Sequence, residues 1–171
     1  EESINNFKKQ LNKRFEISGL DSNKYIGNEK SPYGFDLGIT YPSIKADELV
    51  KRANDAMKQW KNVDLEERTG ICLEILDRIN KKSFDIANSV MHTTGQPYMM
   101  AFQAGGPHAQ DRGLEALTYA YKQLADIPTS AVFEKPTGKD TPPIVVNKKL
   151  KVVSKGISLI ITCSTFPTWN S

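Results

Sequence analysis

The sequence predicts an α/β fold, which within this chain takes the α+β form of helices followed by strands. Its 171 residues, 39% of them hydrophobic, are enough for one domain with a core. Apolar residues recur at spacings of three and four up to about residue 126, which is typical of helices. Beyond Pro128 the pattern changes to short β-branched runs separated by turn residues, which indicates strands.

Residues 1–43 are predicted to form a short helix and an extended arm. Between residues 3 and 15, apolar side chains recur at helical spacing and can bury one stripe: Ile4, Phe7, Leu11 and Phe15. Residues 16–42 contain Gly, Pro and Asn without helical period, so we expect an ordered arm across a neighbouring surface.

Two long helices are expected next. Ser43 can cap a helix over residues 44–60, and Asp64, with Glu67 three residues later, can cap a second helix. The second helix is expected to pause near residues 81–83 and to resume through Met91. Each helix has a stripe that we expect to be buried: Ile44, Leu49, Ala53, Ala56, Met57 and Trp60 in the first, and Cys72, Ile75, Leu76 and Ile79 in the second.

A further helical region follows the break at Gly95-Gln96-Pro97. It is interrupted at Gly105-Gly106 and then runs from about 108 to 125, with an expected core side of Leu114, Leu117, Ala120, Tyr121 and Leu124. The two glycines lack the preceding strand and the lysine or third glycine of a phosphate-binding loop, so a helix bend is favoured. The polar stretch from His108 to Arg112 either lines a substrate entrance or simply begins a helix, and the second interpretation is favoured.

Four short runs after residue 128 are predicted strands: 131–133, 144–146, 150–153 and 157–163. A hairpin is expected over 144–153, with the lysine-rich stretch 148–151 as its solvated turn. The last run is apolar on both alternating faces, as in a central strand of a parallel sheet. Because that strand lacks neighbours within the sequence, we expect the chain to be truncated at its C-terminal end.

Composition narrows the functional classes. The net charge is +3, and neither a basic face nor a nucleic-acid-binding motif is present, which argues against nucleic-acid binding. Retention on a heparin column that does not change with salt concentration would exclude nucleic-acid binding. Two cysteines are too few for a disulfide framework, and neither a signal peptide nor a membrane-spanning run is evident, so a cytoplasmic protein without membrane association is expected. His92 and His108 have no partner at metal-ligand spacing, and no metal is predicted.

Three segments together resemble the front of the aldehyde dehydrogenase superfamily: AMKQWKNVDLEER from Ala56, the stretch ending TTGQP at Pro97, and the strand from Gly156 that leads into Thr165-Phe166-Pro167. The strings TGQPYMMAFQAGGPHAQDRGLEA and CSTFPTWNS resemble in particular the subfamily named for phenylacetic acid degradation. This resemblance implies the N-terminal part of a Rossmann-type NAD(P)-binding domain over 44–171, with helices at 44–126 and the hairpin and first sheet strand at 130–163.

The resemblance also implies a chemistry. Family members bind an aldehyde as a thiohemiacetal on a cysteine, pass hydride to NAD or NADP, and release the acyl group to water or coenzyme A. That cysteine comes downstream of this chain, so Cys72 and Cys163 are not expected to be catalytic. Thr165 falls where most members have the asparagine that donates to the oxyanion, unless Asn170 takes that place in a shifted register. The residues expected to border the cofactor are Ile161, Thr162, Cys163 and Ser164, with ordinary strand-end packing as the alternative.

The parent protein is thus expected to act on a small-molecule aldehyde, including one carried on a coenzyme A thioester, and to form a homodimer or homotetramer. This chain alone is expected to be inactive. An alternative function, in which the protein is not an enzyme, is a helical assembly module that docks on another subunit through its hairpin by strand addition.

Overall fold

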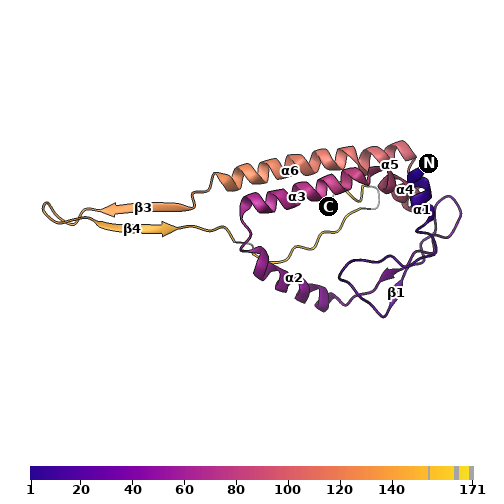
Figure 1. The fold of residues 1–171 in the computed structure, drawn as a ribbon, viewed down its shortest axis with the longest axis horizontal. Coiled ribbons are helices and arrows are strands. Elements are labelled where there is room, and N and C mark those ends of the chain that lie inside the picture. Colours follow the sequence, from indigo (N-terminus) through magenta and orange to yellow (C-terminus); the bar gives the residue numbers. More distant parts are fainter. Residues whose placement is uncertain (154, 164–165, 170–171) are drawn as a thin grey trace.

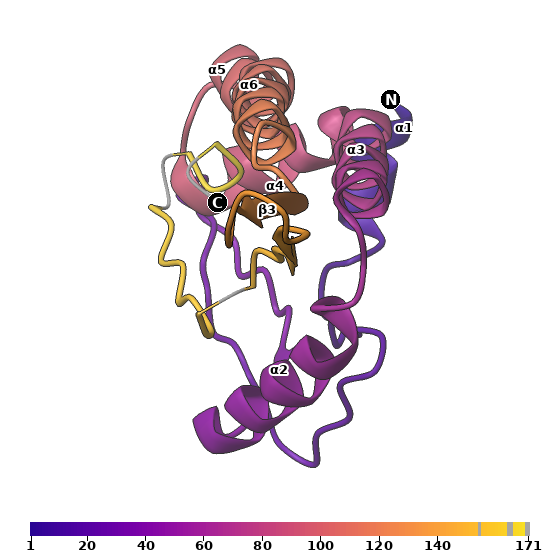
Figure 2. The same cartoon turned by 90° about the vertical axis from the view of Figure 1, so that its left-hand side faces the viewer.

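The computed structural model describes residues 1–153, 155–163 and 166–169. A body of helices carries one long hairpin that projects from it, and the chain then runs back beside the helices (Figures 1 and 2). The mixture of helices and strands confirms the predicted fold class.

The N-terminal arm forms a small core of its own. Helix α1 spans Glu2–Lys8, and the two short strands β1 (Tyr25–Ile26) and β2 (Tyr41–Pro42) pair antiparallel. Phe7 of α1 is buried together with Leu37 and Ile39 of the arm. Helix α1 ends earlier than predicted, because Asn12 adopts a left-handed backbone conformation and its amide donates to the carbonyl of Leu37 instead of continuing the helix.

The next two helices are α2 (Ala46–Trp60) and α3 (Leu65–Lys81). The Asp64 cap is confirmed, since its carboxylate accepts a 2.8 Å hydrogen bond from the amide of Glu67. The Ser43 cap is wrong: Lys45 occupies the cap position, and the backbone of Ser43 is bonded to the arm. Neither helix has a buried residue, so their apolar stripes are only partly covered.

Three further helices follow, and they hold the second core. They are α4 (Ser83–Thr94), α5 (Tyr98–Gly105) and α6 (Pro107–Ala125). Ala87 and Val90 of α4 pack against Ala101 of α5 with all three side chains buried. Helix α6 lies alongside α3 (Figure 1), yet its only buried residue is Ala109, so the core side predicted further along α6 is not buried in this chain.

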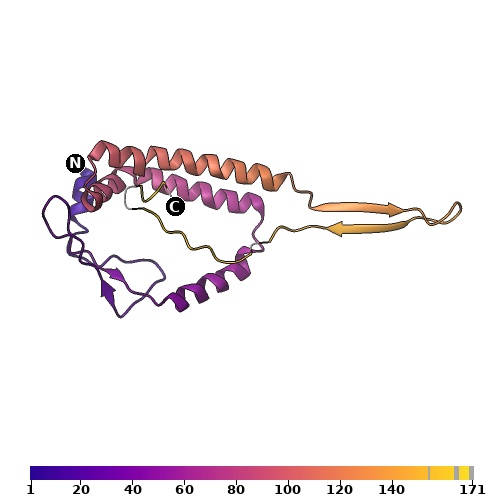
Figure 3. The same cartoon turned by 180° about the vertical axis from the view of Figure 1, so that it is seen from behind.

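The hairpin that projects from the helices (Figure 3) consists of β3 (Ser130–Lys135) and β4 (Ile144–Lys149). The two strands pair antiparallel, with Phe133 opposite Val146. Every residue of both strands is exposed. The predicted turn at 148–151 is wrong, because Lys148 and Lys149 belong to β4 and pair with Ala131 and Ser130. The turn lies at 136–143 instead, and residues 150–153 form no strand.

The run at 157–163 is not a strand here, and its apolar side chains face solvent, with Leu159 84% exposed. A strand is defined by hydrogen bonds to a neighbour, and the described part of the chain offers this run no partner. The prediction of a first sheet strand is therefore not met within this chain.

Candidate functional site

The residues expected to border the cofactor lie in the extended run after Gly156. Ile161, Thr162 and Cys163 are all exposed, and no strand flanks them among the described residues. Ser164 and Thr165, as well as Asn170 of the shifted register, lie outside the described residues. The structure therefore brings three of the expected residues together along one segment, without walls that could enclose a nucleotide.

A short turn over residues 166–169 docks this segment onto the helices. The Thr168 hydroxyl donates a 2.9 Å hydrogen bond to the carbonyl of Gly105, where α5 ends. Trp169 stacks on His108 with ring centroids 6.0 Å apart and planes 26° apart, and Phe166 meets Trp169 edge-on at 5.3 Å. The hydrogen bond of Thr168 and the stacking of Trp169 on His108 thus attach the C-terminal turn to the junction between α5 and α6.

The junction itself depends on glycine. A Cβ on Gly106 would lie 2.8 Å from the carbonyl oxygen of Phe102 and 3.0 Å from the Cβ of Ser83. A side chain at this position would therefore push the backbone of the junction away from α4. The Ser83 hydroxyl accepts a 3.0 Å hydrogen bond from Gln110 in α6, which ties the two helices at this point. The helix-bend interpretation of these glycines is confirmed.

His92 serves packing in α4. Its ring stacks on Phe7 at 4.4 Å and meets Tyr33 and Phe35 edge-on at 5.5 and 5.3 Å, while Nδ1 lies 3.4 Å from the hydroxyl of Ser31. Burial lowers the pKa of His92 below its ordinary value of 6.5. Among the described residues no group of three or more metal-binding side chains converges.

The lowered pKa predicts a pH-dependent stability. Because the folded state holds His92 neutral while the unfolded chain binds a proton near pH 6.5, stability is present above that pH and is lost as the pH falls through it. We expect the urea midpoint of the protein to decrease between pH 7 and pH 5, and His92→Phe to flatten that dependence. An equal slope in His92→Phe would assign the effect to other groups.

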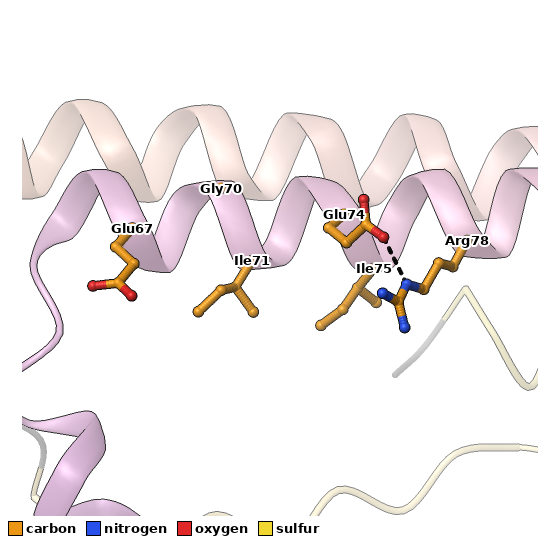
Figure 4. A pocket seen from close by; sticks show the side chains of 6 residues that line it. All are labelled: Glu67, Gly70, Ile71, Glu74, Ile75 and Arg78. Atoms are coloured by element: carbon orange, nitrogen blue, oxygen red, sulfur yellow. Dashed lines mark hydrogen bonds and ion pairs between the residues drawn. The ribbon is translucent and has the colours of Figure 1, made fainter.

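A groove of about 580 Å³ lies along α3 on the side away from α6 (Figure 4). Ile71 and Ile75 supply its apolar floor, and Glu74 pairs with Arg78 at 2.7 Å beside it. It contains no nucleophile with a neighbouring base, so its chemistry suits packing rather than catalysis.

No helix in the described part of the chain is long and apolar enough to cross a membrane.

An NAD-type cofactor does not fit a site made from the described residues alone. Binding its pyrophosphate requires a cradle of backbone amides at a strand-to-helix turn. At the α5–α6 junction Gly106 is closed by Phe102 and Ser83 and Gly105 by Ile86, and the run 161–163 has no helix following it in the described residues.

The comparisons with known proteins identify what this arrangement resembles. The sequence profile of the aldehyde dehydrogenase family matches residues 41–143. The chain is 48% identical to an NAD-dependent aldehyde dehydrogenase from Burkholderia multivorans and superposes on its crystal structure with a TM-score of 0.92 over 99% of the chain. It spans 30% of that structure's length. A search of curated proteins finds no match.

More distant structures share the fold. A 1-pyrroline-5-carboxylate dehydrogenase from Thermus thermophilus is 16% identical to this chain and superposes on it with a TM-score of 0.58. The matched region is 78% of this chain and 28% of that enzyme. An NADP-dependent glyceraldehyde-3-phosphate dehydrogenase from Bacillus halodurans is 20% identical to this chain, with a TM-score of 0.53. The matched region is 68% of this chain and 27% of that enzyme.

Sequence reasoning missed the aromatic cluster of the C-terminal turn. The interpretation favoured for residues 108–112 was a plain helix start, and Trp169 entered only as part of the string CSTFPTWNS. The sequence does contain aromatic residues in the C-terminal turn and polar residues after Gly106 that could contact them. Because the two segments lie far apart in the chain, the sequence alone does not indicate that they meet.

Proposed function

The chain belongs to the aldehyde dehydrogenase family, and on that premise we propose that it is the N-terminal portion of an NAD(P)-dependent enzyme that oxidises an aldehyde. The observation that carries the proposal is the match to the Burkholderia structure at 48% identity over 99% of the chain. At that identity, the backbone path and much of the side-chain chemistry are shared, whereas the distant neighbours support the fold alone.

The nucleophile is proposed to come from the part of the parent beyond this chain. Cys72 is half-buried in α3, which suits a small hydrophobic residue, and Cys163 is exposed on an extended run. The nicotinamide would accept hydride from the thiohemiacetal once bound. This chain would contribute the backbone run at 161–163, the oxyanion donor at Thr165, and the helices that hold them in place.

The finer proposal concerns the substrate. The strings TGQPYMMAFQAGGPHAQDRGLEA and CSTFPTWNS support a place in the catabolism of phenylacetate or related aromatic acids, with a free aldehyde or a coenzyme A thioester that carries one as substrate. The NAD-dependent neighbour supports NAD over NADP. We place the enzyme in the cytoplasm.

The proposal is tested by reduced-nicotinamide formation. The full-length product of the gene that contains this chain is assayed with aromatic and aliphatic aldehydes, each with NAD or NADP and with or without coenzyme A. The 171-residue chain is assayed beside it. We expect activity in the full-length protein only, because we propose that the nucleophile lies outside this chain, and the described residues form no enclosed nucleotide site. A folded full-length protein that reduces neither cofactor would contradict the proposal.

We further propose that the parent is a homo-oligomer whose subunits meet through the β3–β4 hairpin. The hairpin projects from the body (Figure 1), and one of its faces carries the apolar side chains of Phe133, Ile144 and Val146. A face of this kind on an isolated two-stranded ribbon favours association. The same observation supports the alternative function, a non-catalytic assembly module, which predicts self-association without any dehydrogenase activity.

A further inference from the structure

The carbonyl of Gly105 is the point to which the C-terminal turn is bonded. The last carbonyls of a helix have no partner within that helix. At the end of α5, the carbonyl of Gly105 accepts the 2.9 Å hydrogen bond from the hydroxyl of Thr168. Both residues are shielded from solvent, since Gly105 is buried and Thr168 is half-buried. Because a buried carbonyl is costly to leave without a donor, this bond contributes more to holding the turn than an exposed one would.

Gly105 is in turn held against α4. A Cβ on this glycine would lie 3.1 Å from the Cγ2 of Ile86 and 3.8 Å from the Cγ2 of Val90, so its backbone packs directly on side chains of α4. Val90 belongs to the buried core that α4 shares with α5. The acceptor of the Thr168 hydrogen bond is therefore part of a packed core rather than of a free helix end.

The link between Thr168 and Thr165 is short and stiff. Only Phe166 and Pro167 separate the two threonines in the sequence. A proline fixes its own φ and disfavours helical conformations in the residue before it, so both linking residues have restricted backbones. A displacement of Thr168 is consequently passed along the chain to Thr165 rather than absorbed between them.

We propose that Thr168 is a positioning residue, which places the hydroxyl of Thr165 at the oxyanion by tying the turn to the carbonyl of Gly105. The inference rests on the proposed function, in which Thr165 is the oxyanion donor, and adds a residue to it. In this role Thr168 needs no contact with substrate or cofactor. Its effect arises because a hydrogen bond to developing charge depends steeply on distance and angle, so a small misplacement of the donor slows the reaction.

The test compares three variants of the full-length protein. Thr168→Val removes the hydroxyl and keeps the side chain's shape, and it is expected to lower kcat by roughly fivefold to tenfold with KM nearly unchanged. Thr168→Ser keeps the hydroxyl and should retain most of the turnover. Thr118→Val is the matched control, because it removes a 2.7 Å hydroxyl-to-carbonyl hydrogen bond within α6 and should leave kcat unchanged. An unchanged kcat in an active Thr168→Val enzyme, or an equal loss in Thr118→Val, overturns the proposal.

A double substitution separates positioning from a general loss of stability. If Thr168 acts through Thr165, then Thr165→Val already removes the group that is positioned, and adding Thr168→Val has no further effect. The kcat of the double variant should therefore equal that of Thr165→Val alone. Losses that multiply in the double variant would show that Thr168 acts by another route, and the proposal would be wrong.

Hydrogen exchange separates this inference from the proposed function. In Thr168→Val, peptides that contain residues 166–169 are expected to exchange roughly fivefold faster than in the wild type, because the turn has lost the bond that attaches it. Thr168→Ser and Thr118→Val should keep the wild-type rate in these peptides. Unchanged exchange in Thr168→Val overturns the inference whether or not an aldehyde is turned over. A wild type that reduces no cofactor contradicts the proposed function, while the exchange rates still show whether Thr168 holds the turn.

Discussion

Phe133→Lys in the full-length protein is expected to dissociate the proposed oligomer, weakening self-association by about 1,000-fold. Phe133 lies opposite Val146, on the same hairpin face as Ile144, and is 55% exposed in the single chain. An ammonium group buried among these side chains would lose its hydration without gaining a partner. In a two-fold symmetric contact the substitution occurs on both subunits, so a loss of about 2 kcal/mol at each one is doubled.

The opposite hairpin face provides the control for this experiment. Val132 lies opposite Asn147 and is 66% exposed, so Val132→Lys introduces the same charge on a face with more polar neighbours. Sedimentation velocity over a range of concentrations should find monomers for Phe133→Lys and wild-type assemblies for Val132→Lys. If both variants remain assembled, the subunits do not meet through this face. If the dissociated variant also loses its aldehyde oxidation, the assembly supports the active site.

Local features of the fold were predictable because short-range hydrogen bonds determine them. The Asp64 cap needs only the amide of Glu67 three residues away, and the two glycines in succession at 105–106 indicate a helix break from the local sequence alone. Burial was not predictable in the same way. The stripes of α2 and α3 have the periodicity of buried faces, yet burial depends on a partner surface, and the described residues do not provide one for Leu49 or Ile75.

The strands predicted at 131–133 and 144–146 are confirmed as parts of β3 and β4, whereas the strand predicted at 157–163 and the turn predicted at 148–151 were wrong for different reasons. At 157–163 the composition fits a central strand, but hydrogen bonds from a neighbour are missing among the described residues. At 148–149 the lysines suggested a turn, although the length of β3 extends the pairing through them. Composition shows which residues can enter a sheet, whereas register is set by the partner strand.

The candidate site was predictable only in part. The position of residues 161–165 came from a resemblance in sequence order, which gives the position of a residue in the chain but not what surrounds it. The contact of Trp169 with His108 joins segments whose proximity is a property of the folded chain. For the same reason the oxyanion assignment of Thr165, which lies outside the described residues, has to be tested by substitution.

Thr165→Val in the full-length enzyme is expected to lower kcat by about 100-fold, because it removes a hydrogen-bond donor while keeping the side chain's shape. A donor that binds the oxyanion contributes in the transition state more than in the ground state, so KM should change little. Thr165→Ala should show a similar loss. Turnover of saturated enzyme and kcat/KM are measured with one aldehyde, and thermal unfolding confirms that each variant is folded.

Two replacements that keep a donor decide the interpretation. Thr165→Ser retains the hydroxyl and should keep most of the turnover, and Thr165→Asn supplies the longer amide found at this position in most family members and should hold or raise it. If the loss arose from packing, asparagine, which differs more from threonine in shape than valine does, would be the more harmful change. Recovery in the asparagine variant together with loss in the valine variant therefore assigns the effect to hydrogen bonding. Unchanged turnover in both the valine and the alanine variants would remove Thr165 from the mechanism and leave the oxyanion to another donor.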